Sequence, residues 1–348
     1  MEFGLFAEQM RDGVSQDDAL GEMLGLVDAA ESGGLDVFWL AEMMMNPARS
    51  VLSAPLLVAS WIVARTTRLR VGTAVQLLPL NHPLRVAGEV TTLDHLSKGR
   101  FDFGIGRSGS PRAYDALGVP YAESQERFFE ALEIMVAAWK GERFSYQGKF
   151  YQFTDVAVAP RPYRPPHPPL RMAATTPETF PRVAKIGLPI FVGLRGMSIP
   201  ELAGHLRVYR AAWREAGHAG NGDVCLRIPV YAAPTEKAAV EEPHDTITYY
   251  FRRQADLTRA PLGRAGTGPV ERRVAQAQRL SELSYDDILA TKVAFGTGPG
   301  LVDRFAQLKE ELGVNGVAAE LNPGGLLSPD QEMRSLQILM REVMPAFK

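Results

Sequence analysis

Polar side chains that could do chemistry follow several short apolar runs of the sequence. Gly104-Ile105-Gly106-Arg107-Ser108-Gly109 comes directly after such a run and satisfies the GxGxxG pattern of dinucleotide-binding loops. That fingerprint normally opens a helix at once, whereas Pro111, Gly118 and Pro120 interrupt the stretch that follows here. We therefore interpret the motif as a strand-end loop in which Arg107 and backbone N–H groups could bind a phosphate.

Three threonines and one glutamate offer further polar groups. Thr175, Thr176 and Thr179 lie where a helix should begin, so their hydroxyl groups suit either an anion or plain N-capping. Glu42 is a candidate acid/base or polar anchor, or else a paired structural carboxylate. The run Met43-Met44-Met45 after it is either an adaptable apolar wall for a bulky substrate or simple packing.

Composition excludes several classes of function. The 348 residues include 38 basic and 40 acidic side chains, a net charge of -2, which gives no reason to expect a nucleic-acid or anionic-membrane surface. A single cysteine, Cys225, excludes an intrachain disulfide, and a Cys/His zinc cluster or other metal site is not expected. With no basic leader and no apolar stretch of the ~20 residues that a membrane span needs, we expect a cytoplasmic protein.

The elements that must position these residues follow from hydrophobic periodicity. Short apolar runs of β character alternate with segments of helical period, which is typical of βα units around a parallel sheet. The expected strands are Phe3–Ala7, Val37–Ala41, Leu69–Leu78, Phe101–Ile105, Leu170–Ala174, Pro189–Leu194, Cys225–Tyr231 and Val317–Leu321. The expected helices are Asp17–Ser32, Ser53–Arg65, Val86–Leu96, Ser124–Trp139 and Gln331–Val343, with two more beginning near Pro177 and Pro200. This alternation favours a (β/α)8 barrel over an open sheet.

Two stretches break the βα rhythm. Residues 141–169 are rich in aromatics and proline and are predicted to form a surface hairpin followed by an extended excursion. Residues 257–287 are either a solvated insertion or a mobile lid, and they contain Gly263, Gly266, Gly268, Arg259, Arg264, Arg272, Arg273 and Arg279. Because a bare barrel takes ~250 residues, these insertions account for the surplus length, and one domain over residues 1–348 is expected.

Several segments resemble a known family. Residues 71–85 (VGTAVQLLPLNHPLR) and 93–107 (LDHLSKGRFDFGIGR) closely resemble the third and fourth βα units of the bacterial luciferase-like flavin-dependent monooxygenases. The resemblance covers nearly the whole chain and includes residues 38–42 (FWLAE), 187–189 (GLP), 295–298 (FGTG) and 342–345 (EVMP). As a combination, these motifs are specific.

The resemblance implies that FMN binds at the C-terminal mouth of the barrel. A non-prolyl cis peptide bond, here between Ala74 and Val75, would press against the isoalloxazine ring. The residues implied at the flavin phosphate are Gly106, Arg107, Arg127 in the fourth helix, Thr175, Thr176 and Thr179.

This sequence departs from the family at one position. Luciferase-like members commonly carry Glu-His after the second strand, and that histidine is linked to proton transfer at the flavin. Here Met43 occupies its place, and a thioether cannot transfer a proton. Glu42, Met43 and Met44 are therefore the candidate groups at the reacting centre.

The resemblance implies a two-component FMN-dependent monooxygenase. Reduced FMN would come from a separate flavin reductase, O2 would add at the flavin C4a, and the resulting (hydro)peroxide would oxidise an organic substrate. That substrate would be apolar or aromatic, such as a secondary-metabolite intermediate, held near Phe6, Met43 and Met44. An F420-dependent hydride-transfer oxidoreductase and a non-catalytic flavin-binding barrel are the alternatives. Many members of the family are homodimers, which we expect here as well.

Overall fold

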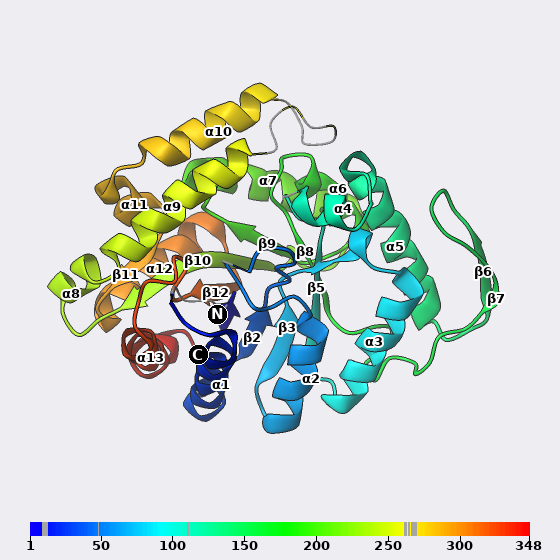
Figure 1. The fold of residues 1–348 in the computed structure, drawn as a ribbon, viewed down its shortest axis with the longest axis horizontal. Coiled ribbons are helices and arrows are strands. Elements are labelled where there is room, and N and C mark those ends of the chain that lie inside the picture. Colours follow the sequence, from blue (N-terminus) through cyan, green and yellow to red (C-terminus); the bar gives the residue numbers. More distant parts are fainter. Residues whose placement is uncertain (9–12, 48, 110, 261–262, 264, 266–269) are drawn as a thin grey trace.

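Parallel strands form a closed 8-stranded ring at the centre of the molecule (Figure 1). The computed structural model describes residues 1–8, 13–47, 49–109, 111–260, 263, 265 and 270–348. In ring order the strands are β1 (Glu2–Ala7), β2 (Val37–Leu40), β3 (Arg70–Thr73), β5 (Phe101–Gly106), β8 (Leu170–Ala173), β9 (Ile190–Gly193), β10 (Val224–Ala232) and β12 (Gly316–Glu320). The ring closes because β10 pairs with both β9 and β12. The predicted (β/α)8 barrel is confirmed.

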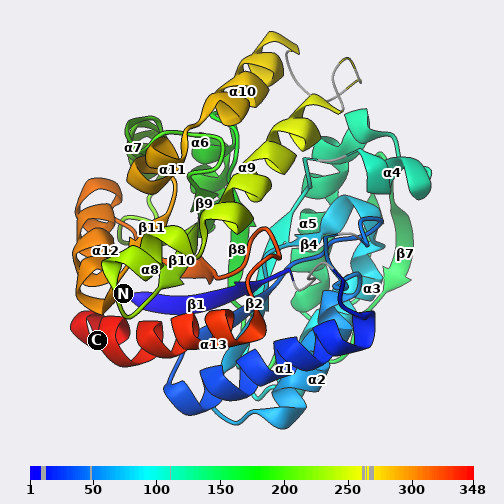
Figure 2. The same cartoon turned by 60° about the vertical axis from the view of Figure 1, so that its left-hand side comes forward.

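Helices surround the ring (Figure 2). The outer helices are α1 (Gln16–Gly33), α2 (Pro55–Arg65), α3 (Pro83–Leu96), α5 (Ser124–Trp139), α6 (Thr179–Ile186), α7 (Ile199–Glu215), α12 (Gly298–Leu312) and α13 (Pro329–Ile338). Shorter helical pieces are α4 (Arg112–Ala116), α8 (Glu236–Glu241), α11 (Tyr285–Thr291), 3-10 turns at Leu78–Leu80, Tyr121–Glu123 and Met344–Phe347, and a π-helical turn at Leu339–Val343. Among the described residues, none of these helices combines the length and apolar character that crossing a bilayer requires.

Local sequence signals set many of the helix ends. The hydroxyl of Ser198 caps α7, and the Glu201 side chain bonds back to the Ser198 backbone, which forms a capping box. Helix α1 ends at Gly34, where φ is 80°, a left-handed conformation that glycine adopts without steric cost. The predicted helix boundaries therefore agree with the structure to within a few residues.

The structure differs from the prediction at two strands. The predicted strand Leu69–Leu78 is two strands, β3 and β4 (Gln76–Leu77), because the chain changes direction at a cis peptide bond, and both pair with β5. The additional strand β11 (Ala294–Gly296) pairs with the last residues of β10, which extend beyond their pairing with β9. A run of three residues is too short to show a hydrophobic period.

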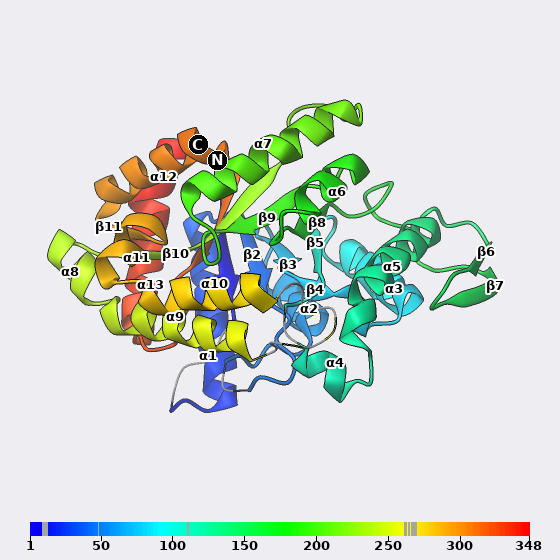
Figure 3. The same ribbon diagram turned by 90° about the horizontal axis from the view of Figure 1, so that it is seen from above.

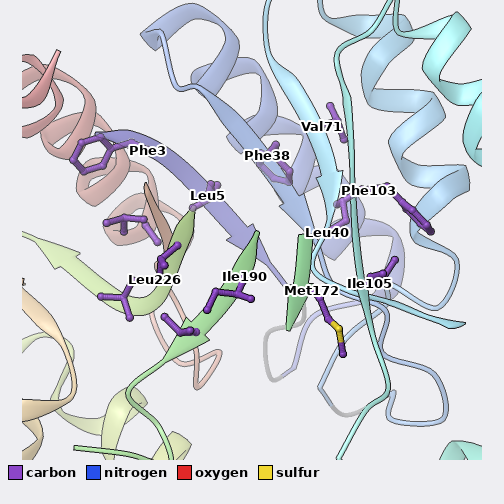
Figure 4. Close-up of a cluster of buried hydrophobic side chains, with 14 of the residues drawn as sticks. Phe3, Leu5, Phe38, Leu40, Val71, Phe103, Ile105, Met172, Ile190 and Leu226 are labelled. Atoms are coloured by element: carbon purple, nitrogen blue, oxygen red, sulfur yellow. The ribbon is translucent and has the colours of Figure 1, made fainter. Parts of the chain in front are cut away.

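Side chains alternate between the two faces of the ring strands. Outward side chains such as Phe3, Phe38 and Leu226 belong to the main core cluster (Figure 4). Inward side chains include Trp39 and Phe191, which meet edge to face with their ring centroids 4.8 Å apart. These two rings form an apolar layer across the inside of the barrel.

The two predicted insertions have different structures. Residues 141–169 contain the expected hairpin of β6 (Phe144–Gln147) and β7 (Gln152–Val156), at the right-hand edge of Figure 1. Residues 257–287 are largely helical, since they contain the end of α9 (His244–Arg259), all of α10 (Val270–Glu282) and the start of α11. Helices α9 and α10 lie side by side (Figure 3). Arg264, Gly266 and Gly268 lie outside the described residues.

Candidate active site

An apolar surface lies at the mouth of the barrel, the end at which the ring strands have their carboxyl termini. Phe6, Met43, Ala74 and Val75 belong to one cluster with Ala41, Trp39 and Phe191. The peptide bond between Ala74 and Val75 is cis, as the resemblance implied. The structure thus brings together four predicted site residues that come from the ends of three strands.

The glycines of β5 make room for this segment. A Cβ atom on Gly104 would lie 1.9 Å from the carbonyl oxygen of Thr73, and one on Gly106 would lie 2.3 Å from Cγ2 of Val75. Real side chains cannot approach so closely, so both positions need glycine for packing. This explains the first two glycines of the GxGxxG match without a dinucleotide, in agreement with our interpretation of the sequence.

The carboxyl group of Glu42 is buried beside the cis bond. The backbone N–H of Leu77 donates to its Oε2 atom at 2.6 Å. Burial raises the pKa of Glu42 from its ordinary value of 4.5 to about 7, although hydrogen bonds from Leu77 and Asn81 act in the opposite direction. A carboxyl group with such a pKa can hold or release a proton near neutral pH.

Gln76 was not among the predicted site residues. Its side chain is 4% exposed, and within the described part of the chain its Oε1 atom has no hydrogen-bond partner. A buried acceptor without a partner costs about 1–3 kcal/mol. The sequence could have indicated this site residue, because Gln76 is a polar residue in an otherwise apolar stretch, directly after the Ala74–Val75 bond. This acceptor suits a polar ligand with an N–H group at its edge, as the isoalloxazine ring of FMN has.

The three methionines do not form one wall. Met43 packs on the apolar cluster, whereas Met44 is half-buried in the following turn and is not part of that cluster. Met45 is 44% exposed and has a φ of 59°. Of the three methionines, only Met43 therefore packs against the cluster that Ala74 and Val75 also contact.

The loop after β5 holds Arg107 at the start of α5. Its Nη1 atom donates to Ser124 Oγ at 2.8 Å, and the hydroxyl of Tyr114 donates to its carbonyl oxygen. Arg127, also on α5, instead pairs with Glu123 at 2.8 Å and lies over the ring of Phe150 in the hairpin, 4.2 Å from its centroid. The two predicted phosphate arginines therefore have separate surroundings.

The predicted threonines bond to one another after the neighbouring strand β8. The Oγ1 atoms of Thr176 and Thr179 are 2.9 Å apart, and α6 begins at Thr179. Thr175 is exposed. Because β5 and β8 pair in the ring, these hydroxyl groups and Arg107 follow adjacent strand ends.

A network of ion pairs across the mouth was missed at the sequence level. Arg227 of β10 donates from Nε and Nη2 to Glu320 of β12 at 3.0 and 2.7 Å, and from Nη2 to Glu8 at 2.9 Å. Arg49 donates twice to Glu8, at 2.5 Å each. Burial alone would raise the pKa of Glu8, but Arg49 and Arg227 hold it at about 2. The sequence could have indicated this network, because Arg227 lies within an apolar strand and Glu8 and Glu320 lie at the ends of two others.

Helix α10 contacts several loops of the mouth. Arg272 lies 3.5 Å from Glu178 just before α6, and Arg279 lies 3.0 Å from Glu201 at the start of α7. Arg273 donates to the carbonyl oxygen of Gly109, after β5, at 3.4 Å. The arginines of the predicted insertion therefore attach α10 to the ends of three barrel strands.

Comparison with known proteins agrees with this architecture. Residues 1–316 match the family model described as luciferase-like monooxygenase. The oxygenase component of a flavin-dependent trigonelline monooxygenase from Acinetobacter baylyi is 25% identical over 364 residues, covering 100% of this chain and 96% of that protein. An F420-dependent glucose-6-phosphate dehydrogenase from Kineococcus radiotolerans is 32% identical over 49% of this chain.

Several of the curated relatives, the Kineococcus protein among them, are matched over only about half of their length. Among solved structures, the oxygenating constituent of 3,6-diketocamphane monooxygenase from Pseudomonas putida, in complex with FMN, has a TM-score of 0.83 at 22% identity. That alignment covers 99% of this chain and 98% of the Pseudomonas chain, and it shows a shared fold.

Proposed function

The chain belongs to the luciferase-like monooxygenases, and from this premise we propose that it is the oxygenase component of a two-component FMN-dependent monooxygenase. The observation that carries the proposal is the apolar surface of Phe6, Met43, Ala74 and Val75, which lies beside the buried Glu42 carboxyl group. Bound reduced FMN would supply the electrons that activate O2 for oxidation of an organic substrate. The relative named as an oxygenase component supports delivery of that flavin by a separate reductase.

The residues present fit FMN. The segment Ala74–Val75 would contact one face of the isoalloxazine ring, and Gln76 Oε1 would accept a hydrogen bond from its polar edge. The flavin phosphate would lie at Gly106 and Arg107, with the hydroxyl groups of Thr175, Thr176 and Thr179 on the neighbouring strand end. Arg127 would bind the phosphate only after breaking its ion pair with Glu123.

The protein's own groups would then control protons and water. Glu42, adjacent to Met43, holds a proton near neutral pH and takes over the proton exchange for which the family commonly uses a histidine. Phe6 and Met43 provide an apolar site for an apolar or aromatic part of the substrate. Helices α9 and α10 act as the lid that keeps water from the reacting centre.

Hydride transfer with F420 is the second candidate, and the Kineococcus relative supports it. The two functions differ in the cofactor that the mouth prefers, so direct competition between reduced FMN and reduced F420 distinguishes them. A non-catalytic barrel is not proposed, because relatives that span most of this chain are named as enzymes.

The proposal also includes a homodimer in the cytoplasm. On α2, Leu57 and Trp61 lie one turn apart and are 74% and 47% exposed, which suits contact with a second copy.

Anaerobic titration with reduced FMN tests the proposed function. We expect saturable binding, and mixing the complex with O2 should give a transient flavin absorbance that differs from both the reduced and the oxidised spectrum. Incorporation of oxygen-18 from labelled O2 into a turned-over substrate would establish oxygenation. Absence of reduced-FMN binding at tens of micromolar, with tight binding of reduced F420, would overturn the proposal in favour of hydride transfer.

A further inference from the structure

The ion network at the mouth has an excess of positive charge. Arg227 and Arg49 are neutralised by Glu320 and Glu8 through the hydrogen bonds described above. A third arginine, Arg195, lies close enough to Glu8 to lower the pKa of that carboxyl group. Within the part of the chain that the structure describes, Arg195 forms no hydrogen bond or ion pair. Among the described residues, Arg195 and the network together thus hold three arginines and two carboxylates.

Arg195 follows the mouth end of β9. Phe191 points into the barrel from β9, and a Cβ on Gly193 would lie 3.3 Å from the Arg227 carbonyl oxygen. Arg195 lies in the bend that follows β9, two residues beyond Gly193, and therefore at the end of this strand that forms the mouth. It is exposed, whereas the Glu8 carboxylate, whose pKa it lowers, is largely buried.

Tyr250 of α9 adds a neutral polar group to this region. Its side chain is 4% exposed, and burial raises the pKa of its hydroxyl group, with Glu320 adding to the rise and Arg195 opposing it. It therefore stays protonated at neutral pH and can donate a hydrogen bond. Arg253 of the same helix reaches Asn46 in the loop that leads to Arg49, with 3.3 Å between Nη2 and Oδ1. Helix α9 thus contributes a hydroxyl donor.

The network adjoins the apolar surface of the candidate site. The guanidinium carbon of Arg227 lies 3.6 Å from the centroid of the Phe6 ring, and Phe6 belongs to the same cluster as Met43, Ala74 and Val75. A molecule over Phe6 would therefore contact apolar side chains at one end and the cationic group at the other. Such an arrangement suits an amphiphilic anion.

We propose that the substrate is an organic carboxylate, whose carboxylate group binds Arg195 and the hydroxyl of Tyr250 while its apolar part lies over Phe6 and Met43. This inference rests on the proposed function, since it names the substrate class of the same site. A guanidinium group offers two parallel N–H donors to a carboxylate, which a neutral amide of the same shape cannot use as well. Arg49 and Arg227 keep their own carboxylate partners, so the substrate does not compete with Glu8 or Glu320.

Binding of matched probe pairs tests the proposal without turnover. Calorimetry measures the binding of three acids, benzoate, cinnamate and octanoate, to the protein saturated with oxidised FMN. The uncharged amide of each acid is titrated in a parallel experiment. At least one acid should bind about 10-fold more tightly than its amide. Arg195→Gln should abolish that preference, Arg195→Lys should retain part of it, and Tyr250→Phe should reduce it several-fold. Arg214→Gln, on the exposed face of α7, makes the same charge change away from the mouth and should leave the preference intact.

Equal binding of acid and amide, no binding of any of the three acids, or a preference that survives Arg195→Gln would overturn this inference. Reduced-FMN binding is measured on the same preparations. If reduced FMN binds but the preference is absent, only the substrate class is wrong. If the preference is present but reduced FMN does not bind, the proposed function fails instead.

Discussion

The carboxylate of Glu42 accepts a hydrogen bond from the backbone N–H of Leu77 at 2.6 Å, and this bond joins the end of β2 to β4. Leu77 lies two residues beyond the cis bond, so the bond also fixes the segment that would contact the flavin. Because Glu42 is buried, the pKa of the same carboxyl group is raised to about 7.

Replacing Glu42 by glutamine should change how stability depends on pH. The folded-state pKa of about 7 lies above the ordinary 4.5, so the folded protein keeps this proton longer than the unfolded chain does. Wild-type stability therefore falls as the pH rises from 4.5 to 7, by up to about 3 kcal/mol from this group. Glu42→Gln has no titrating group at this position and lacks this loss. In urea unfolding, the free energy of unfolding of the variant minus that of wild type should therefore rise between pH 4.5 and pH 7. A difference that stays constant with pH would contradict the raised pKa.

Substituting Gly104 should disrupt the cis segment. The new methyl group of Gly104→Ala would collide with the backbone carbonyl of Thr73, which cannot rotate away as a side chain could. We expect a loss of about 1–3 kcal/mol in unfolding free energy, together with weaker FMN binding. Gly109→Ala, in the same motif but with no atom within 4 Å of the added carbon, is the matched control and should unfold like wild type. Similar behaviour of both variants would refute the packing explanation.

Phosphate recognition should depend on Arg107 more than on Arg127. Arg107→Gln should weaken FMN binding by about 10- to 100-fold, because it removes a charge-assisted contact, while riboflavin binding should hardly change. Arg127→Gln should have a smaller effect, since that guanidinium is engaged by Glu123. Equilibrium dialysis with both flavins measures the difference. An equal loss for FMN and riboflavin would place the phosphate elsewhere.

The contacts of α10 should control its opening. Arg272 and Arg279 form exposed ion pairs, each worth about 0–1 kcal/mol. The double variant Arg272→Gln/Arg279→Gln should therefore exchange the amide hydrogens of α10 several-fold faster, and raised salt should do the same to wild type. Exchange in α1, which neither arginine contacts, serves as the internal control. In the presence of reduced FMN and O2, the variant should release more hydrogen peroxide, and unchanged exchange would argue against a lid held by these pairs.

The exposed apolar face of α2 should mediate self-association. Leu57→Glu/Trp61→Glu places two charges on that face and should shift the protein from dimer to monomer in light-scattering chromatography. Val208→Glu, on the exposed side of α7, tests whether any surface charge has this effect and should leave the dimer intact. A monomeric wild type, or a dimer that persists in the α2 variant, would contradict this part of the proposal.

The barrel was predictable because its signals are local. Phe3–Ala7 is a short run of apolar residues, all of them buried, so a window of a few residues is enough to show the strand. Helix ends follow equally local signals, such as the cap at Ser198 and the glycine at Gly34. The cis bond and the flavin came from resemblance, since periodicity shows neither.

The candidate site was only partly predictable because its partners are distant in the sequence. Arg227 and Glu8 are 219 positions apart, and they meet only when β12 pairs with β10 on one side and with β1 on the other. Likewise, the turn after β2 decides that Met43 packs on the apolar cluster while Met45 is exposed. Gln76 becomes an acceptor without a partner only when the folded chain buries it. The sequence by itself determined the eight ring strands, most of the outer helices and their order. Tertiary closure decided which charges meet at the mouth, because burial and pairing depend on surroundings that only the folded chain assembles.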